Sequence, residues 1–124
     1  MKHFEEWLLK AEHDLLSAQA LSAEKHNLYD TAVYHTQQAA EKALKAFLVA
    51  HNKEIPKTHN VRLLLTQCCL IQDNLELLAQ NVITVAPYDT LYRYPADSLS
   101  PSLQQTQAAI ISASEILKTI KELL

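Results

Sequence analysis

Glycine is absent from this chain of 124 residues. Phosphate-cradling loops and dinucleotide-binding turns need glycine, because only a residue without a Cβ atom lets the backbone approach a phosphate that closely. The absence therefore excludes both classes of site. A phosphate or a nucleotide would have to be held here by side chains or at helix N-termini.

Long hydrophobic runs are also missing, and the chain has only two cysteines. No stretch is apolar over the ~20 residues that cross a bilayer, and charged residues precede any hydrophobic stretch at the N-terminus, which argues against a signal peptide. Cys68 and Cys69 are adjacent, a spacing that suits neither an ordinary structural disulfide nor a metal cage. We therefore expect a cytoplasmic protein without membrane association.

The charge balance excludes one more class of function. The formal net charge is −3, with 48% hydrophobic and 20% charged residues. This composition predicts one folded domain over residues 1–124, and its weak negative charge argues against wholesale wrapping by nucleic acid. Basic residues nevertheless gather between positions 42 and 62, which suits a local anion site. They are Lys42, Lys45, Lys53, Lys57 and Arg62.

What the chain has in abundance is helical periodicity. It predicts long helices over residues 2–22 and 28–51, a third helix capped by Thr58 or Asn60, a fourth ending before Pro87, and a last one running to the C-terminus. The caps expected for the second, fourth and last helices are Asn27, a capping box of Asp73 with Glu76, and Ser100 followed by Pro101. The fold class is thus all-α, an up-and-down bundle of four to five helices.

The second predicted helix carries a polar row that a core does not need. His35, Gln38, Lys42 and Lys45 recur three or four residues apart, so they lie along one face. The row is either the solvated edge of an amphipathic helix or the wall of a surface that binds an anion or an acidic partner. The pattern alone leaves both readings open.

His59 follows Thr58 at the expected start of the third helix. A histidine there either anchors the loop by local hydrogen bonds or, with Lys57, contributes to an anion site. The histidines of the chain lack the spacing of a metal site, so neither a metal nor a cofactor is expected.

The segment "YRYP" at residues 92–95 places Arg93 between Tyr92 and Tyr94. One interpretation pairs Arg93 with the carboxylate of Asp89 or Asp97. The other uses its guanidinium for a phosphate and a tyrosine ring for a base.

Two stretches of the chain, together with the order and length of the predicted helices, resemble the HEPN domain family. "YHTQQAAEKALKAFLVAHNKEIPKTHNVRLLL" is similar to that family's glutamine–alanine–glutamate–lysine helix and threonine–histidine turn, and "YRYP" to the arginine–tyrosine–proline segment of many prokaryotic members. The resemblance spans essentially the whole chain. It implies a helical bundle that forms homodimers and often works beside a small nucleotidyltransferase, in toxin–antitoxin pairs.

Some HEPN proteins are metal-independent ribonucleases that use an arginine followed four to six residues later by a histidine. The arginines of this chain are Arg62 and Arg93, and no histidine follows either, because His59 is the last histidine. The departure from the nuclease motif favours a protein that is not an enzyme.

The leading hypothesis is therefore a homodimeric module that binds a nucleotide or RNA near Arg93, Lys42 and His59 and interacts with a nucleotidyltransferase. The dimer surface would include parts of the second helix and the "YRYP" loop. The alternative is a metal-independent ribonuclease with a non-standard active site, with Arg93 as the cation and His59 or His35 as the base. The candidate ligand-binding residues are Arg93, Tyr94, Tyr92, His59, Lys42, Lys45, Gln38 and His35.

Overall fold

The structure is a computed structural model that describes residues 2–95 and 99–124, and every regular element in them is helical. The all-α prediction is confirmed. The elements are α1 (His3–Leu21), α2 (Tyr29–Ala50), α3 (Val61–Ile71), the 3₁₀ helix η1 (Asp73–Leu78), α4 (Ala79–Val85), the 3₁₀ helix η2 (Ala86–Asp89) and α5 (Leu103–Leu123).

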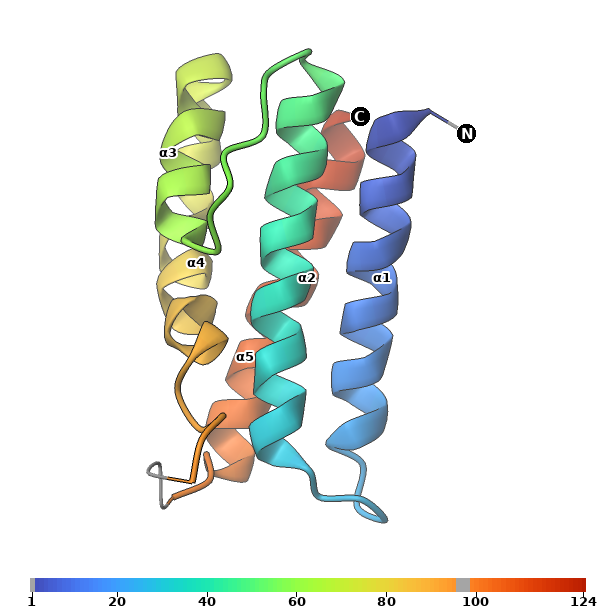
Figure 1. Ribbon diagram of the computed structural model, residues 1–124, viewed down its shortest axis with the longest axis vertical. Coiled ribbons are helices and arrows are strands. Elements are labelled where there is room, and N and C mark those ends of the chain that lie inside the picture. The colour runs from blue at the N-terminus through green and yellow to red at the C-terminus, as the bar shows by residue number, and fades with distance from the viewer. Residues whose placement is uncertain (1, 96–98) are drawn as a thin grey trace.

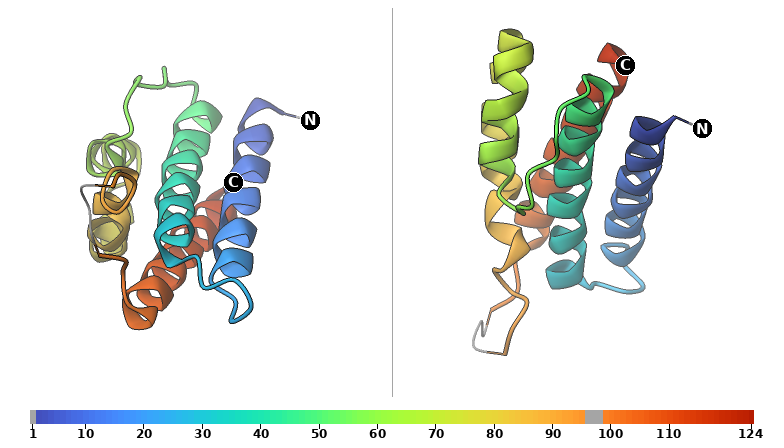
Figure 2. Two further views of the ribbon diagram at one scale, coloured as in Figure 1. Left: turned by 60° about the horizontal axis from the view of Figure 1, so that its bottom comes forward. Right: turned by 45° about the horizontal axis from the view of Figure 1, so that its top comes forward.

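Helix α2 is the centre of the bundle. It contacts α1, α3, α4, α5 and η2. In Figure 1, α1 runs antiparallel on one side of α2, α3 and α4 lie on the other side, and α5 crosses behind. The turned views of Figure 2 keep this arrangement. Residues on α2 can therefore take part in polar contacts on both of its flanks.

Small side chains let the helices pack closely around α2. Its fully buried alanines stand beside a few large residues, Leu44, Phe47 and Leu48, which fill the space toward the other helices. The alanines are Ala32, Ala39, Ala40, Ala43 and Ala46. The shorter helices and α5 complete one continuous core, contributing among others Leu64, Leu78, Ile116 and Ile120.

Two of the predicted helix starts are wrong by one or two residues. Helix α2 begins after Leu28, because Asn27 adopts a left-handed backbone (φ 52°) that turns the chain before the helix and does not cap it. Helix α5 is capped by Ser102 instead of Ser100, and Ser102 forms a reciprocal capping box with Gln105. The predicted cap Asn60 is confirmed, since its side chain accepts a hydrogen bond from the Leu63 backbone N–H.

The predicted fourth helix is two elements. Asp73 and Glu76 form no capping box, and residues 73–78 are the 3₁₀ helix η1, which leads directly into α4. The periodicity of the predicted fourth helix includes Ile83 in its apolar face, but Ile83 is 45% exposed. The buried residues Leu75, Leu78, Val82 and Val85 keep a spacing of three or four residues through η1 and α4, and Ile83 lies beside this stripe.

Candidate functional site

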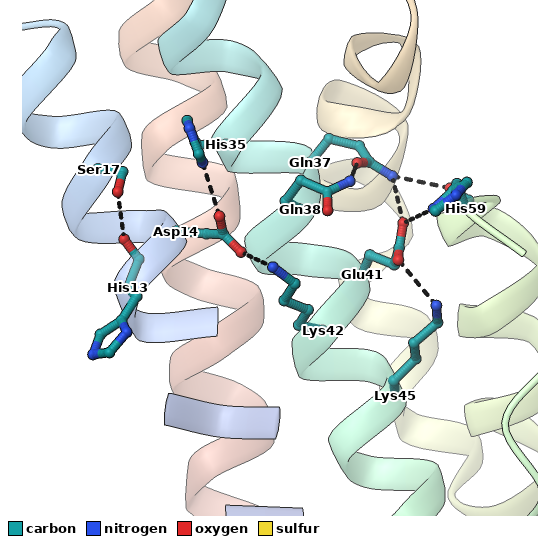
Figure 3. Close-up of polar contacts among 10 residues, drawn as sticks. All are labelled: His13, Asp14, Ser17, His35, Gln37, Gln38, Glu41, Lys42, Lys45 and His59. Carbon is teal, nitrogen blue, oxygen red and sulfur yellow. Dashed lines mark hydrogen bonds and ion pairs between the residues drawn. The ribbon is translucent and has the colours of Figure 1, made fainter. Parts of the chain in front are cut away.

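A buried carboxylate lies on the flank of α2 that faces the loop before α3. Glu41 is 3% exposed, and both of its oxygens are occupied. Oε1 lies 2.9 Å from Nδ1 of His59, and Oε2 accepts a hydrogen bond of 2.9 Å from Nζ of Lys45. Gln37 adds a donor at 3.4 Å to Oε1 and also donates to the backbone carbonyl of His59. We call Gln37, Glu41, Lys45 and His59 the Glu41 cluster (Figure 3).

The other flank of α2 faces α1 and carries a second carboxylate with a similar set of partners. Asp14 of α1 is 8% exposed. One of its oxygens lies 2.8 Å from Nδ1 of His35, and the other accepts a hydrogen bond of 2.6 Å from Nζ of Lys42. Figure 3 shows both side chains reaching from α2 to Asp14. Because a carboxylate only accepts hydrogen bonds, Nδ1 of His35 carries the proton in the neutral ring, and Nε2 is free of it.

The polar row on α2 is therefore divided between two ion-pair clusters. His35 and Lys42 bind Asp14, and Lys45, which is 8% exposed, binds Glu41. Gln38 donates to the side-chain oxygen of Gln37. The row is not a simple solvated edge, because His35 and Lys42 tie α2 to α1 and Lys45 is buried against Glu41 on α2 itself.

Near the N-terminal end of α2, the loop after η2 closes over a small hollow. The Arg93 guanidinium lies over the ring of Tyr34, 4.1 Å from its centroid, and 5.9 Å from that of Tyr94. Its Nη1 donates to the backbone carbonyl of Asp89 at 3.1 Å. The hollow has a volume of about 290 Å³. We call it the Arg93 hollow; it is lined by Asp30, Thr31, Tyr34, His35, Tyr92 and Arg93.

Within residues 2–95 and 99–124, no carboxylate pairs with Arg93. The expected contact with Asp89 exists, but it is made by the backbone carbonyl, whereas Asp97 lies outside the described residues. Among the described residues, the guanidinium makes one side-chain hydrogen bond, to the Asp89 carbonyl, and its flat face rests on an aromatic ring. An exposed cation beside tyrosine rings can bind a phosphate and a planar group at the same time.

The structure brings some of the candidate residues together and keeps others apart. Arg93, Tyr92 and His35 line one hollow, with the Tyr94 ring beside Arg93. Lys42 and Lys45 bind the two buried carboxylates. His59 lies at a separate hollow. Gln38 lines neither hollow.

Sequence reasoning missed three residues that organise this surface: Asp14, Gln37 and Tyr34. Asp14 and Gln37 stand within the apolar stripes of their helices, between Ala11 and Ala18 and between Val33 and Ala40. A polar residue at an apolar position predicts a buried hydrogen-bonding partner, so a signal was present. Nothing in the sequence distinguishes Tyr34 as the ring under Arg93.

The two cysteines are free thiols and lie away from these clusters. Burial raises the pKa of the Cys68 thiol to about 12, with a smaller contribution from Cys69. Burial and the nearby carboxylate of Glu76 also raise the pKa of Cys69. Because a thiolate is the reactive form, neither thiol is activated as a nucleophile.

Two further kinds of feature are absent from the described ranges, a metal site and a membrane span. There, no group of three or more His, Cys, Asp or Glu side chains is placed to hold a metal ion. No helix in the same ranges combines the length and the apolar character that crossing a membrane requires.

A helical bundle organised around two ion-pair clusters on one central helix has well-matched relatives. The family model for the HEPN domain matches residues 4–123. TT1696 from Thermus thermophilus is 27% identical, with all of both chains covered and a TM-score of 0.86. ST0689, an archaeal HEPN homologue, is 26% identical over 99% of this chain and 98% of its own, with a TM-score of 0.76. Among curated proteins, none matches the chain.

The protein therefore belongs to the HEPN domain family. The prediction made from the glutamine–alanine–glutamate–lysine helix and the "YRYP" segment is confirmed. Of the residues in these two stretches, Gln37, Glu41 and His59 lie in the Glu41 cluster, Lys42 binds Asp14, and Tyr92 and Arg93 line the Arg93 hollow.

Proposed function

We propose that this HEPN protein is a nucleotide- or RNA-binding module whose ligand site is the Arg93 hollow. The observation that carries the proposal is the position of Arg93: stacked on Tyr34, held by a backbone carbonyl and without a carboxylate partner in the described part of the chain. An arginine that only braced a loop would usually be neutralised by a carboxylate. Within the described residues the guanidinium is oriented by uncharged groups, an aromatic ring and a backbone carbonyl, which leave its charge for a ligand.

The walls of the hollow fit the two parts of a nucleotide. Phosphate oxygens suit the planar guanidinium fork, which donates two parallel hydrogen bonds. The ring of Tyr94, which is 59% exposed, offers a face on which a base can stack, whereas the ring of Tyr92 stacks on Tyr88 and forms a wall of the hollow. Because the chain has no glycine-rich loop, side chains are the groups available for such a site.

We further propose that the protein acts as a homodimer and as the interaction partner of a small nucleotidyltransferase, in a toxin–antitoxin-like pair. The exposed loop around Arg93 lies beside the N-terminal part of α2, so a symmetric contact there would bring two copies of Arg93 close together. Sedimentation at micromolar concentration tests the dimer, and a monomer at all concentrations would refute it. Co-purification with the product of a neighbouring nucleotidyltransferase gene tests the pair.

The test of the ligand site is a titration of purified protein with uridine 5′-monophosphate and with short single-stranded RNA. Arg93→Ala should weaken binding at least tenfold. Arg93→Lys should recover only part of it, because an ammonium keeps the charge and loses the fork. Lys118→Ala, which removes one exposed positive charge from α5, is the matched control and should bind like the unmodified protein. Equal binding by all four proteins would refute the site.

One observation favours a second candidate, the metal-independent ribonuclease. His35 lines the same hollow as Arg93, and Asp14 orients its ring through Nδ1. Nε2 of His35 would take the proton of a ribose 2′-hydroxyl while Arg93 stabilises the negative charge on the phosphate. The 2′-oxygen would then displace the 5′-oxygen, which leaves with a proton from water, giving a 2′,3′-cyclic phosphate and a 5′-hydroxyl.

Incubation of RNA with the protein in the presence of a chelator separates the two candidates. The nuclease predicts cyclic-phosphate ends that disappear in both His35→Ala and Arg93→Ala. Intact RNA, together with Arg93-dependent binding, assigns the hollow to binding alone.

A further inference from the structure

A second hollow opens between the start of α3 and η2. It has a volume of about 480 Å³ and is lined by residues 58–62 together with Ala86, Pro87 and Asp89. Its cationic side chain is Arg62, which is exposed and forms no ion pair within the described residues. We call it the Arg62 hollow. Its volume lies within the range of about 300–1,000 Å³ that is usual for small-molecule sites.

His59 presents a fixed ring to the Arg62 hollow. Its side chain is 72% exposed, but Nδ1 is held by Glu41 at 2.9 Å and its backbone carbonyl accepts a hydrogen bond from Gln37. Since Nδ1 serves the carboxylate, Nε2 is the ring nitrogen left for a ligand. In the neutral ring Nε2 is an acceptor that suits a ribose hydroxyl or a base N–H. The buried Glu41 cluster therefore orients a histidine that remains open to solvent.

The two hollows are neighbours. Asp89 lines the Arg62 hollow, and its backbone carbonyl accepts the hydrogen bond from Arg93. On α2, Gln37, which holds His59, follows Tyr34, which lies under Arg93, by three residues. Three residues of α-helix advance about 4.5 Å, so α2 holds the two sites within one turn of each other.

The charges in each hollow match a phosphodiester better than a polyphosphate. The Arg93 hollow contains one guanidinium and the carboxylate of Asp30, and the Arg62 hollow contains one guanidinium and the carboxylate of Asp89. A nucleoside triphosphate concentrates several negative charges in one place, and a nearby carboxylate repels them. A single strand distributes one negative charge per nucleotide, which a lone guanidinium can neutralise in each hollow.

We infer that the two hollows form one track for a single-stranded oligonucleotide, with one phosphate at Arg93 and a neighbouring phosphate at Arg62. His59 would contact the sugar or base between them. The inference rests on the proposed nucleotide site at Arg93 and adds a second subsite, so the ligand spans at least two nucleotides. A positively charged path with aromatic rings beside it is how proteins commonly bind single strands.

Isothermal titration with uridine 5′-monophosphate, a dinucleotide and a tetranucleotide of uridine tests the track. The affinity should rise at least tenfold from the mononucleotide to the tetranucleotide. Arg62→Ala should remove most of this rise while changing the affinity for the mononucleotide less than twofold. It should also reduce the salt dependence of tetranucleotide binding by about one counterion. Lys118→Ala is the charge-matched control, and Arg62→Gln repeats the test with a side chain of similar size.

An affinity independent of strand length would overturn the track, as would an equal loss of mononucleotide and tetranucleotide affinity in Arg62→Ala. Failure of the track alone is distinguishable from failure of the Arg93 site. In the first case Arg93→Ala still weakens mononucleotide binding at least tenfold. In the second, Arg93→Ala changes nothing, and both inferences are overturned.

Discussion

The Glu41 cluster and the Arg93 hollow both lie along α2, yet their charged groups have different kinds of partner. In the cluster, both oxygens of a buried carboxylate are taken by protein donors. In the hollow, a guanidinium rests on an aromatic ring and, among residues 2–95 and 99–124, donates to one backbone carbonyl. A buried ion pair whose carboxylate oxygens both have protein donors stabilises the packing but leaves no oxygen free to bind a ligand. An exposed cation held by uncharged groups keeps the capacity to bind one.

This contrast also explains why the most recognisable part of the sequence is not the proposed ligand site. Gln37, Glu41, Lys45 and His59 fasten the loop before α3 to the middle of α2. They determine where α3 begins and thereby form one wall of the Arg62 hollow. In the proposed function, Gln37, Glu41 and Lys45 position this surface, whereas His59, which Glu41 holds through Nδ1, also faces the proposed ligand.

The largest expected loss of stability is in the Glu41 cluster. Glu41→Gln should lower the free energy of unfolding by about 3–5 kcal/mol, because it leaves the buried ammonium of Lys45 without a carboxylate. Urea denaturation followed by circular dichroism measures the loss. The matched control is Glu12→Gln, which breaks the exposed pair with Lys121 and should cost about 1 kcal/mol or less. Similar losses in the two variants would show that the Glu41 cluster does not act as a buried ion pair.

A smaller effect is expected at the other flank of α2. Asp14→Asn should lower the free energy of unfolding by about 1–3 kcal/mol, because the pairs with His35 and Lys42 are only partly buried and the amide oxygen still accepts one hydrogen bond. The same denaturation experiment measures it. A loss as large as that of Glu41→Gln would mean that solvent exposure does not decide how much each cluster contributes to the free energy of unfolding.

The fold could be predicted from the sequence largely because apolar periodicity and alanine-rich stripes leave few alternatives to a helical bundle. Where the prediction was wrong, a local detail competed with the pattern. Ser102 and Gln105 form a reciprocal capping box two residues after the expected cap, and η1 winds more tightly than an α-helix.

The candidate site could be predicted only in part. "YRYP" drew attention to Arg93, and His35 was among the candidates, but periodicity gives the face of a residue and not its partner on another helix. Asp14 lies 21 residues before His35, and Tyr34 lies 59 residues before Arg93. Such contacts depend on how the helices pack. The sequence therefore could not show that His35 and Lys42 face α1, whereas Lys45 lies on the flank of α2 that faces the loop before α3.

The smallest effect on stability is expected at Arg93. Its contact with the Tyr34 ring is at an exposed position, worth about 0.5–1 kcal/mol, and its single described hydrogen bond goes to an exposed carbonyl. Arg93→Ala should therefore lower the free energy of unfolding by about 1 kcal/mol and the melting temperature by only a few degrees. Calorimetry of this variant beside Glu41→Gln makes the comparison directly. A loss of about 3 kcal/mol or more would mean that Arg93 is a structural residue of the loop, because a side chain reserved for a ligand leaves the empty protein nearly as stable without it.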